Sequence, residues 1–131
     1  MKERECDILL VDDEEDVLLV IGKYLRQQGA KVLTAQETTR ALELLDENKV
    51  GLIILDVNLS AGEDGVELMS FLQVNYPGIP IILYTGFPHD ETQVKDMLSK
   101  GAACYVNKGQ PAEALWFAVQ QVRGSGNKPK P

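Results

Sequence analysis

Leu52-Ile53-Ile54-Leu55-Asp56 is a run of four large apolar residues that ends in a single carboxylate. Such an uninterrupted run is typical of a strand in a parallel sheet that is covered on both faces, because neither side of the strand meets water. Ile8-Leu9-Leu10-Val11 near the start of the chain has the same character and is followed by Asp12-Asp13. The two runs therefore predict two buried strands, each followed by acidic residues.

Helical and strand-like segments alternate along the rest of the chain. Further short apolar runs lie at 32–33, 79–83 and 103–106. Between the runs, apolar residues recur at helical spacing in five segments: Val17 to Leu25 with Gly29 as a C-cap, Ala41 to Leu45, a segment opening with Asp64-Gly65-Val66-Glu67, Asp90 to Lys100, and Pro111 to about Val122. Five strand–helix units predict an α/β fold with a doubly wound parallel sheet, for which the flavodoxin-like (βα)5 order 2-1-3-4-5 is favoured.

The length and composition of the chain predict one domain over residues 1–122. Residues 123–131 are rich in Gly, Pro and Lys, so we expect them to form a linker-like tail that does not extend a helix. Either the protein ends in this tail or a further domain follows it. The net charge of −7 argues against nucleic-acid binding.

Three further features of the chain indicate a cytoplasmic protein that does not span a membrane. No apolar run approaches the roughly 20 residues that cross a bilayer, and the charged N-terminus does not resemble a signal peptide. The two cysteines, Cys6 and Cys104, fall on strands that are not neighbours in the predicted order, so we expect no disulfide.

The carboxyl ends of the predicted strands carry polar residues that should meet at one edge of the sheet. These residues are Asp12 and Asp13 after the first strand, Asp56 after the third, Thr85 after the fourth and Lys108 after the fifth. An acidic pair before a helix could by itself merely complement the helix dipole. The coincidence at four strand ends instead favours a site for a hard divalent cation. Mg²⁺ fits best, with Mn²⁺ as the alternative, since it is held by one or two carboxylates together with a substrate phosphate.

This arrangement favours phosphoryl transfer. Asp56 would attack the phosphorus of a phosphohistidine or an acyl phosphate, while the metal and Lys108 neutralise the phosphoryl oxygens. Thr85 could donate a hydrogen bond to one phosphoryl oxygen only after the group has arrived, which makes Thr85 a candidate switch.

Four blocks of this sequence resemble the signature blocks of response-regulator receiver domains, in the family's order and spacing. They are Leu10-Val11-Asp12-Asp13-Glu14, Ile54 to Leu59, Tyr84-Thr85-Gly86 and Gly101 to Lys108. The resemblance runs from about Asp7 to Val122. It implies a two-component signalling domain, not a metabolic enzyme, that catalyses only its own phosphorylation and dephosphorylation. A sensor histidine kinase or a histidine phosphotransfer protein would supply the phosphoryl group.

The resemblance also implies roles for individual residues. Asp56 matches the phosphoacceptor, Asp13 a direct metal ligand and Asp12 a ligand acting through water. The main-chain carbonyl of Asn58 would complete the metal site, and Thr85 would form a switch pair with Tyr105. Asn58 and Phe87 match the positions that flank the approach of water to an aspartyl phosphate, and Phe87, having no hydrogen-bonding group, predicts a long-lived phosphorylated form.

The sequence departs from the family pattern in the loops around the site. Gly109 follows Lys108 where the family usually has a proline with a cis bond, so Lys108 could be less firmly positioned. Ser60 stands where a proline is usual, and the segment from Asp56 to Gly65 is one residue longer than is typical. These departures keep open a degenerate receiver that serves only as a binding module.

Two other classes of protein share parts of the pattern. A haloacid dehalogenase-type enzyme would have its nucleophile after the first strand with a second Asp two residues later, which Asp12-Asp13-Glu14 lacks. A flavodoxin-like flavin binder would have a phosphate loop rich in Ser, Thr and Gly. His89, the only histidine, is interpreted as a solvated neighbour of a helix cap.

The last helix predicts a partner surface together with the helix before it. A core-facing stripe on this helix leaves two aromatic side chains, Trp116 and Phe117, off the stripe, with Phe117 largely exposed. An exposed aromatic ring indicates a docking surface or a homodimer contact through these two helices.

Overall fold

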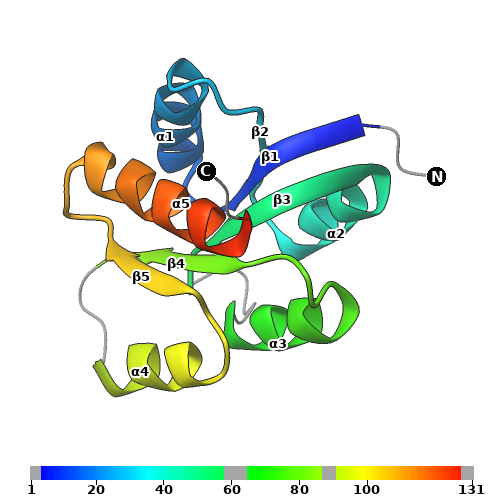
Figure 1. Ribbon diagram of the computed structural model, residues 1–131, viewed down its shortest axis with the longest axis vertical. Coiled ribbons are helices and arrows are strands. Elements are labelled where there is room, and N and C mark those ends of the chain that lie inside the picture. The colour runs from blue at the N-terminus through cyan, green and yellow to red at the C-terminus, as the bar shows by residue number, and fades with distance from the viewer. Residues whose placement is uncertain (1–3, 58–64, 87–90, 128–131) are drawn as a thin grey trace.

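β3 (Asn48–Leu55), which contains the apolar run from Leu52, is the central strand of a five-stranded parallel sheet. The computed structural model describes residues 4–57, 65–86 and 91–127 (Figure 1). The strand order is β2-β1-β3-β4-β5, which confirms the predicted order 2-1-3-4-5. The other strands are β1 (Arg4–Val11), β2 (Val32–Ala35), β4 (Ile81–Thr85) and β5 (Cys104–Asn107).

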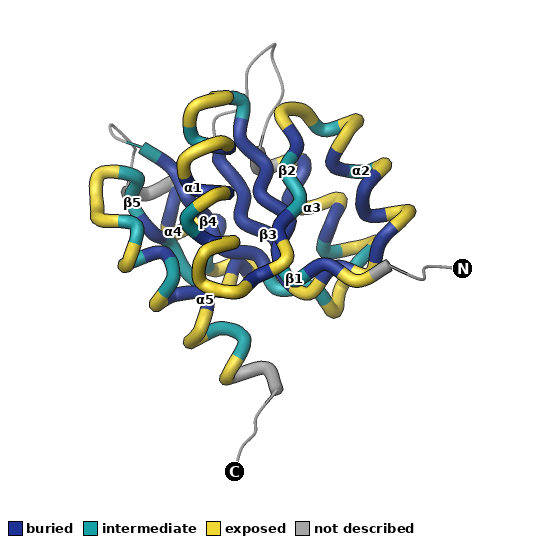
Figure 2. Tube along the Cα trace, turned by 90° about the horizontal axis from the view of Figure 1, so that it is seen from above, coloured by how far each residue is buried: buried dark blue, intermediate teal, exposed yellow. Residues whose placement is uncertain are grey.

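Helices cover both faces of the sheet, as the continuous apolar strands require. They are α1 (Glu15–Gln27), α2 (Thr38–Glu47), α3 (Gly65–Asn75), α4 (Glu91–Ser99) and α5 (Ala112–Asn127). Alternate residues of β1 enter different cores: Leu9 and Val11 pack with residues of α2, α3 and α4, whereas Ile8 and Leu10 pack with residues of α1 and α5. Figure 2 shows the buried strands between helices whose outer faces are exposed. The fold is therefore doubly wound, with a core on each side of the sheet.

Glycines follow two of the helices, and Gly29 is the C-cap that the sequence predicts. Gly29 follows α1 with φ of 103°, and Gly101 follows α4 with φ of 119°, a backbone conformation that other residues rarely adopt. Asp64, the predicted acidic N-cap of α3, lies outside the described residues.

The predicted end of the last helix at about Val122 is wrong, because α5 continues to Asn127. Val122 packs against the edge of the core, and Arg123 Nη2 lies 3.4 Å from Asp7 Oδ1 on β1. These contacts tie the next turn of the helix to the sheet. They offset the cost of glycine in a helix, which is about 1 kcal/mol relative to alanine. The glycine-rich composition by itself therefore predicted too early an end to the helix.

Cys6 and Cys104 are free thiols on β1 and β5, which are separated by β3 and β4, as predicted. Burial raises the pKa of both thiols. Within the described part of the chain, we find no helix with the length and apolar character needed to cross a bilayer.

Candidate functional site

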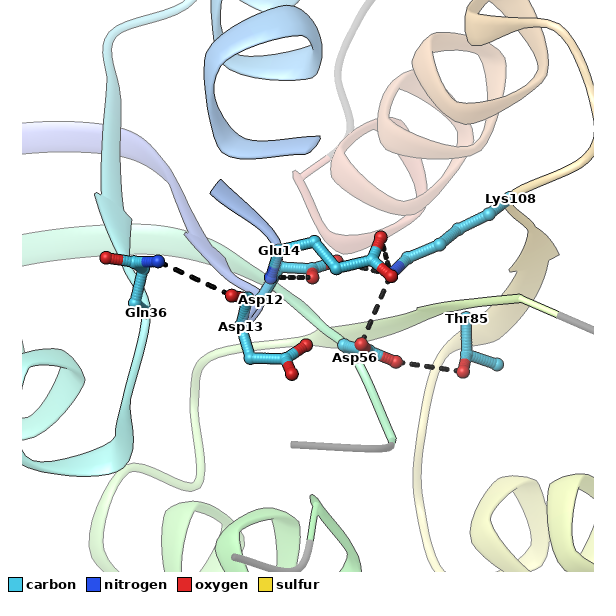
Figure 3. Close-up of polar contacts among 7 residues, drawn as sticks. All are labelled: Asp12, Asp13, Glu14, Gln36, Asp56, Thr85 and Lys108. Carbon is cyan, nitrogen blue, oxygen red and sulfur yellow. Dashed lines mark hydrogen bonds and ion pairs between the residues drawn. The ribbon is translucent and has the colours of Figure 1, made fainter. Parts of the chain in front are cut away.

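The carboxyl ends of the strands bring the predicted polar residues together (Figure 3). Asp12 directly follows β1, Asp56 directly follows β3, Thr85 is the last residue of β4 and Lys108 directly follows β5. β1 and β3 are adjacent, but the chain leaves β1 into α1 and β3 toward α3, and these two helices pack on opposite faces of the sheet. The site thus lies at the point where the winding of the sheet changes direction, which is where ligands bind in this class of fold.

Three carboxylates face one another at this edge. One oxygen from each of Asp12, Asp13 and Asp56 lies within 4.8 Å of the other two. Asp12 and Asp56 are buried, with exposed fractions of 1% and 3%, whereas Asp13 is partly exposed. Three acidic oxygens at such spacing, open to solvent on the Asp13 side, are a donor set that suits a hard divalent cation such as Mg²⁺.

Lys108 supplies the positive charge that balances these carboxylates in the structure. Its Nζ lies 2.7 Å from Asp12 Oδ2 and 3.1 Å from Asp56 Oδ2. The contact with Asp12 is short but poorly directed, so that among the described residues this buried oxygen has an ionic partner without a well-formed hydrogen bond. Such an oxygen retains the capacity to accept a further ligand, a metal-bound water included, which supports the fit of a cation.

The electrostatics of the site reflect burial and an excess of acid. Burial raises the pKa of Asp12 to about 6, and the charge of Asp56 adds to the effect, while Lys108 and the main-chain N–H of Glu14 offset it in part. Burial would lower the pKa of Lys108, but the neighbouring Asp12 and Asp56 outweigh it and raise that pKa. The lysine therefore stays charged at neutral pH, and one ammonium does not fully compensate the carboxylates.

Thr85 lies directly against the candidate nucleophile. Its side chain is fully buried, and Oγ1 donates a hydrogen bond of 2.9 Å to Asp56 Oδ1. Asp56 therefore contacts Thr85 through one oxygen and Lys108 through the other. The sequence predicted that the hydroxyl lies near Asp56 but not that it bonds to the carboxylate itself.

Tyr105 is partly exposed on β5, beside the strand that carries Thr85. The register pairs Leu83 with Tyr105 and Thr85 with Asn107, so Tyr105 and Thr85 lie two residues apart along neighbouring strands on the same face. The hydroxyl of Tyr105 accepts a hydrogen bond of 2.9 Å from Asn107 Nδ2. The two residues of the predicted switch pair are therefore close neighbours in the sheet.

Several predicted positions lie outside the described residues. Asn58, Phe87 and His89 are among them, as is the loop that contains Ser60, so their predicted roles stay predictions.

Two contacts at the site were not predicted from the sequence. Glu14 Oε1 lies 3.6 Å from Lys108 Nζ, although the glutamate is mostly exposed. Gln36 Nε2 donates a long hydrogen bond of 3.4 Å to the main-chain oxygen of Asp13. In the sequence, only the positions of these two residues could have indicated the contacts, because Glu14 follows the acidic pair and Gln36 follows the end of β2.

Comparison with known proteins gives one family across most of the chain. The family model described as the response regulator receiver domain matches residues 8–120. The acidic cluster and Lys108 lie within the matched range, as do the strands of the sheet apart from residues 4–7 of β1.

Individual relatives agree with the family match. A putative NtrX-like response regulator of Rickettsia bellii is 36% identical over 103 residues, which cover 78% of this chain and 21% of that protein. The nitrogen assimilation regulatory protein NtrX of Azorhizobium caulinodans is 31% identical over 117 residues, covering 88% of this chain and 26% of the relative. The chain thus spans about a fifth to a quarter of the length of these curated relatives.

A solved structure supports the same conclusion at the level of the fold and the domain. The receiver domain of NtrX from Brucella abortus superimposes with a TM-score of 0.83 and is 25% identical in sequence. The match covers 91% of this chain and 99% of that domain.

Proposed function

Because the chain belongs to the response regulator receiver domain family of two-component signalling, we propose that Asp56 accepts a phosphoryl group and thereby switches the binding of a partner. The observation that carries this proposal is the position of Asp56 between Thr85 Oγ1 at 2.9 Å and Lys108 Nζ at 3.1 Å, within the acidic cluster. No other carboxylate among the described residues has this combination of neighbours.

The transfer would proceed at a carboxylate oxygen of Asp56. That oxygen attacks the phosphorus of a phosphohistidine or a small acyl phosphate in line with the leaving group. The new bond is P–O, and the bond that breaks joins phosphorus to the donor's imidazole nitrogen or acyl oxygen, which leaves with the electron pair. The product is an acyl phosphate on Asp56, and the domain acts on no other substrate.

Lys108 contributes charge to this reaction without contributing a proton. Its raised pKa keeps the ammonium charged, and its contact with Asp56 places that charge where the phosphoryl oxygens would arrive. For Lys108 to follow the incoming group, its contact with Asp12 would have to lengthen.

Asp12, Asp13 and Asp56, with the main-chain carbonyl of Asn58 by resemblance, would hold Mg²⁺, with Mn²⁺ as the alternative ion. The bound ion would supply positive charge to the phosphoryl oxygens. By the resemblance, Asp13 and Asp56 would be direct ligands and Asp12 would act through water; the partial exposure of Asp13 leaves it accessible to an ion from solvent.

Thr85 and Tyr105 would report the arrival of the phosphoryl group. The hydroxyl of Thr85 now bonds to Asp56 and would turn to a phosphoryl oxygen once Asp56 is modified. Tyr105 would then rotate inward into the space that Thr85 leaves, changing the surface formed by β5 and its flanking helices.

The partners would be a sensor histidine kinase or a histidine phosphotransfer protein as donor, and a surface of α4 and α5 for output or homodimerisation. Phe117 on α5 is 63% exposed, as predicted, while Trp116 is half-buried against the edge of the core. An aromatic ring that is this exposed on a helix supports a docking role for its face.

Phosphorylation by acetyl phosphate tests the proposal. In Mg²⁺, intact-mass measurement should show one added phosphoryl group on the wild type and none on Asp56→Asn. Asp46→Asn removes an exposed carboxylate from α2 and serves as the matched control, which should be modified like the wild type. If Asp56→Asn is modified as fully as the control, the assignment fails. If the wild type takes up no phosphoryl group, the chain is a binding module of the receiver fold.

A further inference from the structure

The turn that carries Lys108 is closed by both main-chain and side-chain hydrogen bonds. Gln110 N donates to the main-chain oxygen of Asn107 at 3.0 Å, and Asn107 N donates to Gln110 Oε1 at 3.2 Å. Inside the turn, Gly109 N donates to Asn107 Oδ1 at 2.7 Å. Lys108 N donates to the main-chain oxygen of Thr85 at 3.0 Å. The backbone of Lys108 is therefore held by its neighbour strand and by the side chain of the residue before it.

Gly109 is compatible with this turn in a way that proline is not. A proline at this position has no N–H to donate to Asn107 Oδ1. A Cβ placed on Gly109 would lie only 3.0 Å from that same oxygen, which is closer than most real Cβ contacts. Glycine at this position therefore allows the hydrogen bond to Asn107 Oδ1 that fixes the turn, and a proline would remove that hydrogen bond.

The same Asn107 amide makes a second hydrogen bond, so that its Oδ1 and Nδ2 atoms form two arms with different partners. Its Nδ2 donates to the hydroxyl of Tyr105 at 2.9 Å, while its Oδ1 accepts from Gly109. Tyr105 and Asn107 are two residues apart on β5 and so project from the same face. Because the amide is planar and rigid, rotation of the Asn107 side chain moves both arms at once.

We propose that Asn107 is a positioning residue that couples the orientation of the Tyr105 ring to the turn carrying Lys108. While the Tyr105 hydroxyl accepts from Nδ2, the amide is oriented with Oδ1 toward Gly109, and the turn is held. When the tyrosine ring turns away, Nδ2 loses this partner and the hydrogen bond from Gly109 N to Asn107 Oδ1 weakens. Its consequence for phosphoryl transfer rests on the proposed function above, but the coupling itself is a property of the metal-free protein.

Three substitutions separate the two arms. Tyr105→Phe removes only the hydroxyl, Asn107→Leu removes both arms at similar size, and Asn107→Ser keeps a side-chain oxygen that can accept from the N–H two residues on. The first readout is the exchange rate of the Gly109 amide proton, measured by NMR without divalent ions. We expect roughly fivefold faster exchange in Asn107→Leu, as the loss of one ordinary hydrogen bond implies.

Tyr105→Phe decides whether the two arms are coupled, because its missing hydroxyl makes no contact with Gly109. Under the proposal it also speeds exchange of the Gly109 amide, by roughly two- to fivefold, and adds nothing further in an Asn107→Leu background. Unchanged Gly109 exchange in Tyr105→Phe would overturn the coupling. If Asn107→Leu does not fold, the coupling is tested by measuring the effect of Tyr105→Phe on Gly109 exchange in the wild type and again in Asn107→Ser. Under the proposal, the effect of Tyr105→Phe is lost in that background.

The second readout is the rate of phosphorylation by acetyl phosphate in Mg²⁺. We expect Asn107→Leu to be slower by roughly three- to tenfold, because Lys108 is less firmly held. An unchanged rate would show that the turn does not position Lys108. A wild type that takes up no phosphoryl group would count against the proposed function only, since amide exchange would still report the coupling.

Discussion

Lys108 Nζ lies 2.7 Å from Asp12 Oδ2, although the two residues follow β5 and β1, which are separated by two strands of the sheet. The lysine side chain reaches across β4 and β3 to a carboxylate that is 1% exposed. The contact shows that the acidic end of β1 and the loop after β5 form one electrostatic unit. A cation held by all three carboxylates would share Asp12 with this ammonium.

Replacing Asp12 with asparagine should stabilise the metal-free protein. Burial raises the pKa of Asp12 from its ordinary value of 3.8 to about 6, so the charged carboxylate is disfavoured in the folded state. This penalty is full above pH 6 and disappears as the pH falls toward 4, where the residue is protonated whether folded or unfolded. We expect Asp12→Asn to raise the free energy of unfolding by about 1–3 kcal/mol at pH 7.5, measured by urea denaturation in EDTA.

The gain should shrink steadily between pH 6 and pH 4.5. Asp16→Asn, at an exposed position in the first turn of α1, is the control: it loses a favourable interaction with the helix dipole, so it should lower the free energy of unfolding by less than about 1 kcal/mol and not raise it. A loss of stability in Asp12→Asn at pH 7.5 would mean that the ion pair with Lys108 outweighs the cost of burial.

Magnesium should stabilise the wild-type protein against unfolding. At a Mg²⁺ concentration ten times its dissociation constant, the expected gain is about 1.4 kcal/mol. Asp13→Asn should lose most of this gain, since the partly exposed Asp13 is the proposed direct ligand that Lys108 does not contact. The measurement is the thermal midpoint with and without Mg²⁺ at equal ionic strength. Equal shifts in the wild type and Asp13→Asn would place the ion elsewhere.

The strand ends explain why so much of the site could be predicted. Asp56 directly follows an apolar run and Lys108 comes two residues after another, and a parallel sheet brings the ends of such runs to one edge. Contacts that depend on side-chain rotamers or on the path of a turn could not be predicted in this way. The contact of Glu14 with Lys108 and the two arms of Asn107 are of this kind.

The order of the strands followed from the same logic, whereas one helix end did not. Gly and Pro in the tail predicted an end of α5 near Val122, but local propensity is weaker than tertiary contact. Arg123 meets Asp7, a residue 116 positions earlier, and no local pattern records that pairing.

Thr85→Val should destabilise the protein while keeping the shape of the side chain. The hydroxyl donates to a buried carboxylate, and such bonds contribute about 1.5–3 kcal/mol. We expect a loss of roughly that size at pH 7.5, and a smaller loss for Thr85→Ser, which retains the hydroxyl. Urea denaturation of the two variants measures both. A Thr85→Val variant as stable as the wild type would show that the hydrogen bond to Asp56 contributes nothing to the free energy of unfolding.

Phe87 is predicted to prolong the phosphorylated state. By resemblance it occupies one of the two positions that flank the approach of water to the aspartyl phosphate, and its ring cannot orient a water molecule. Phe87→Glu should therefore speed loss of the phosphoryl group by roughly tenfold, equivalent to about 1.4 kcal/mol of barrier. Time courses of phosphate loss in Mg²⁺ measure this rate. Equal rates for Phe87→Glu and the wild type would leave the residue with no part in timing.

Phe117→Glu should weaken association through α5 without harming the fold. The ring is 63% exposed, so its replacement removes little buried surface and should change the free energy of unfolding by less than about 0.5 kcal/mol. Its neighbour Leu115 is fully buried, and Leu115→Ala, which should cost about 2–5 kcal/mol, shows what a core position on the same helix does.

The readout for the α5 surface is the molar mass in solution, measured by light scattering before and after phosphorylation. If phosphorylation promotes a homodimer through α4 and α5, Phe117→Glu should remain a monomer under conditions in which the wild type dimerises, because a carboxylate would replace an apolar ring in the contact. Val74→Glu is the matched control, since Val74 is 78% exposed on α3, away from this surface. A dimer that persists in Phe117→Glu and is lost in Val74→Glu would move the contact from α5 to α3.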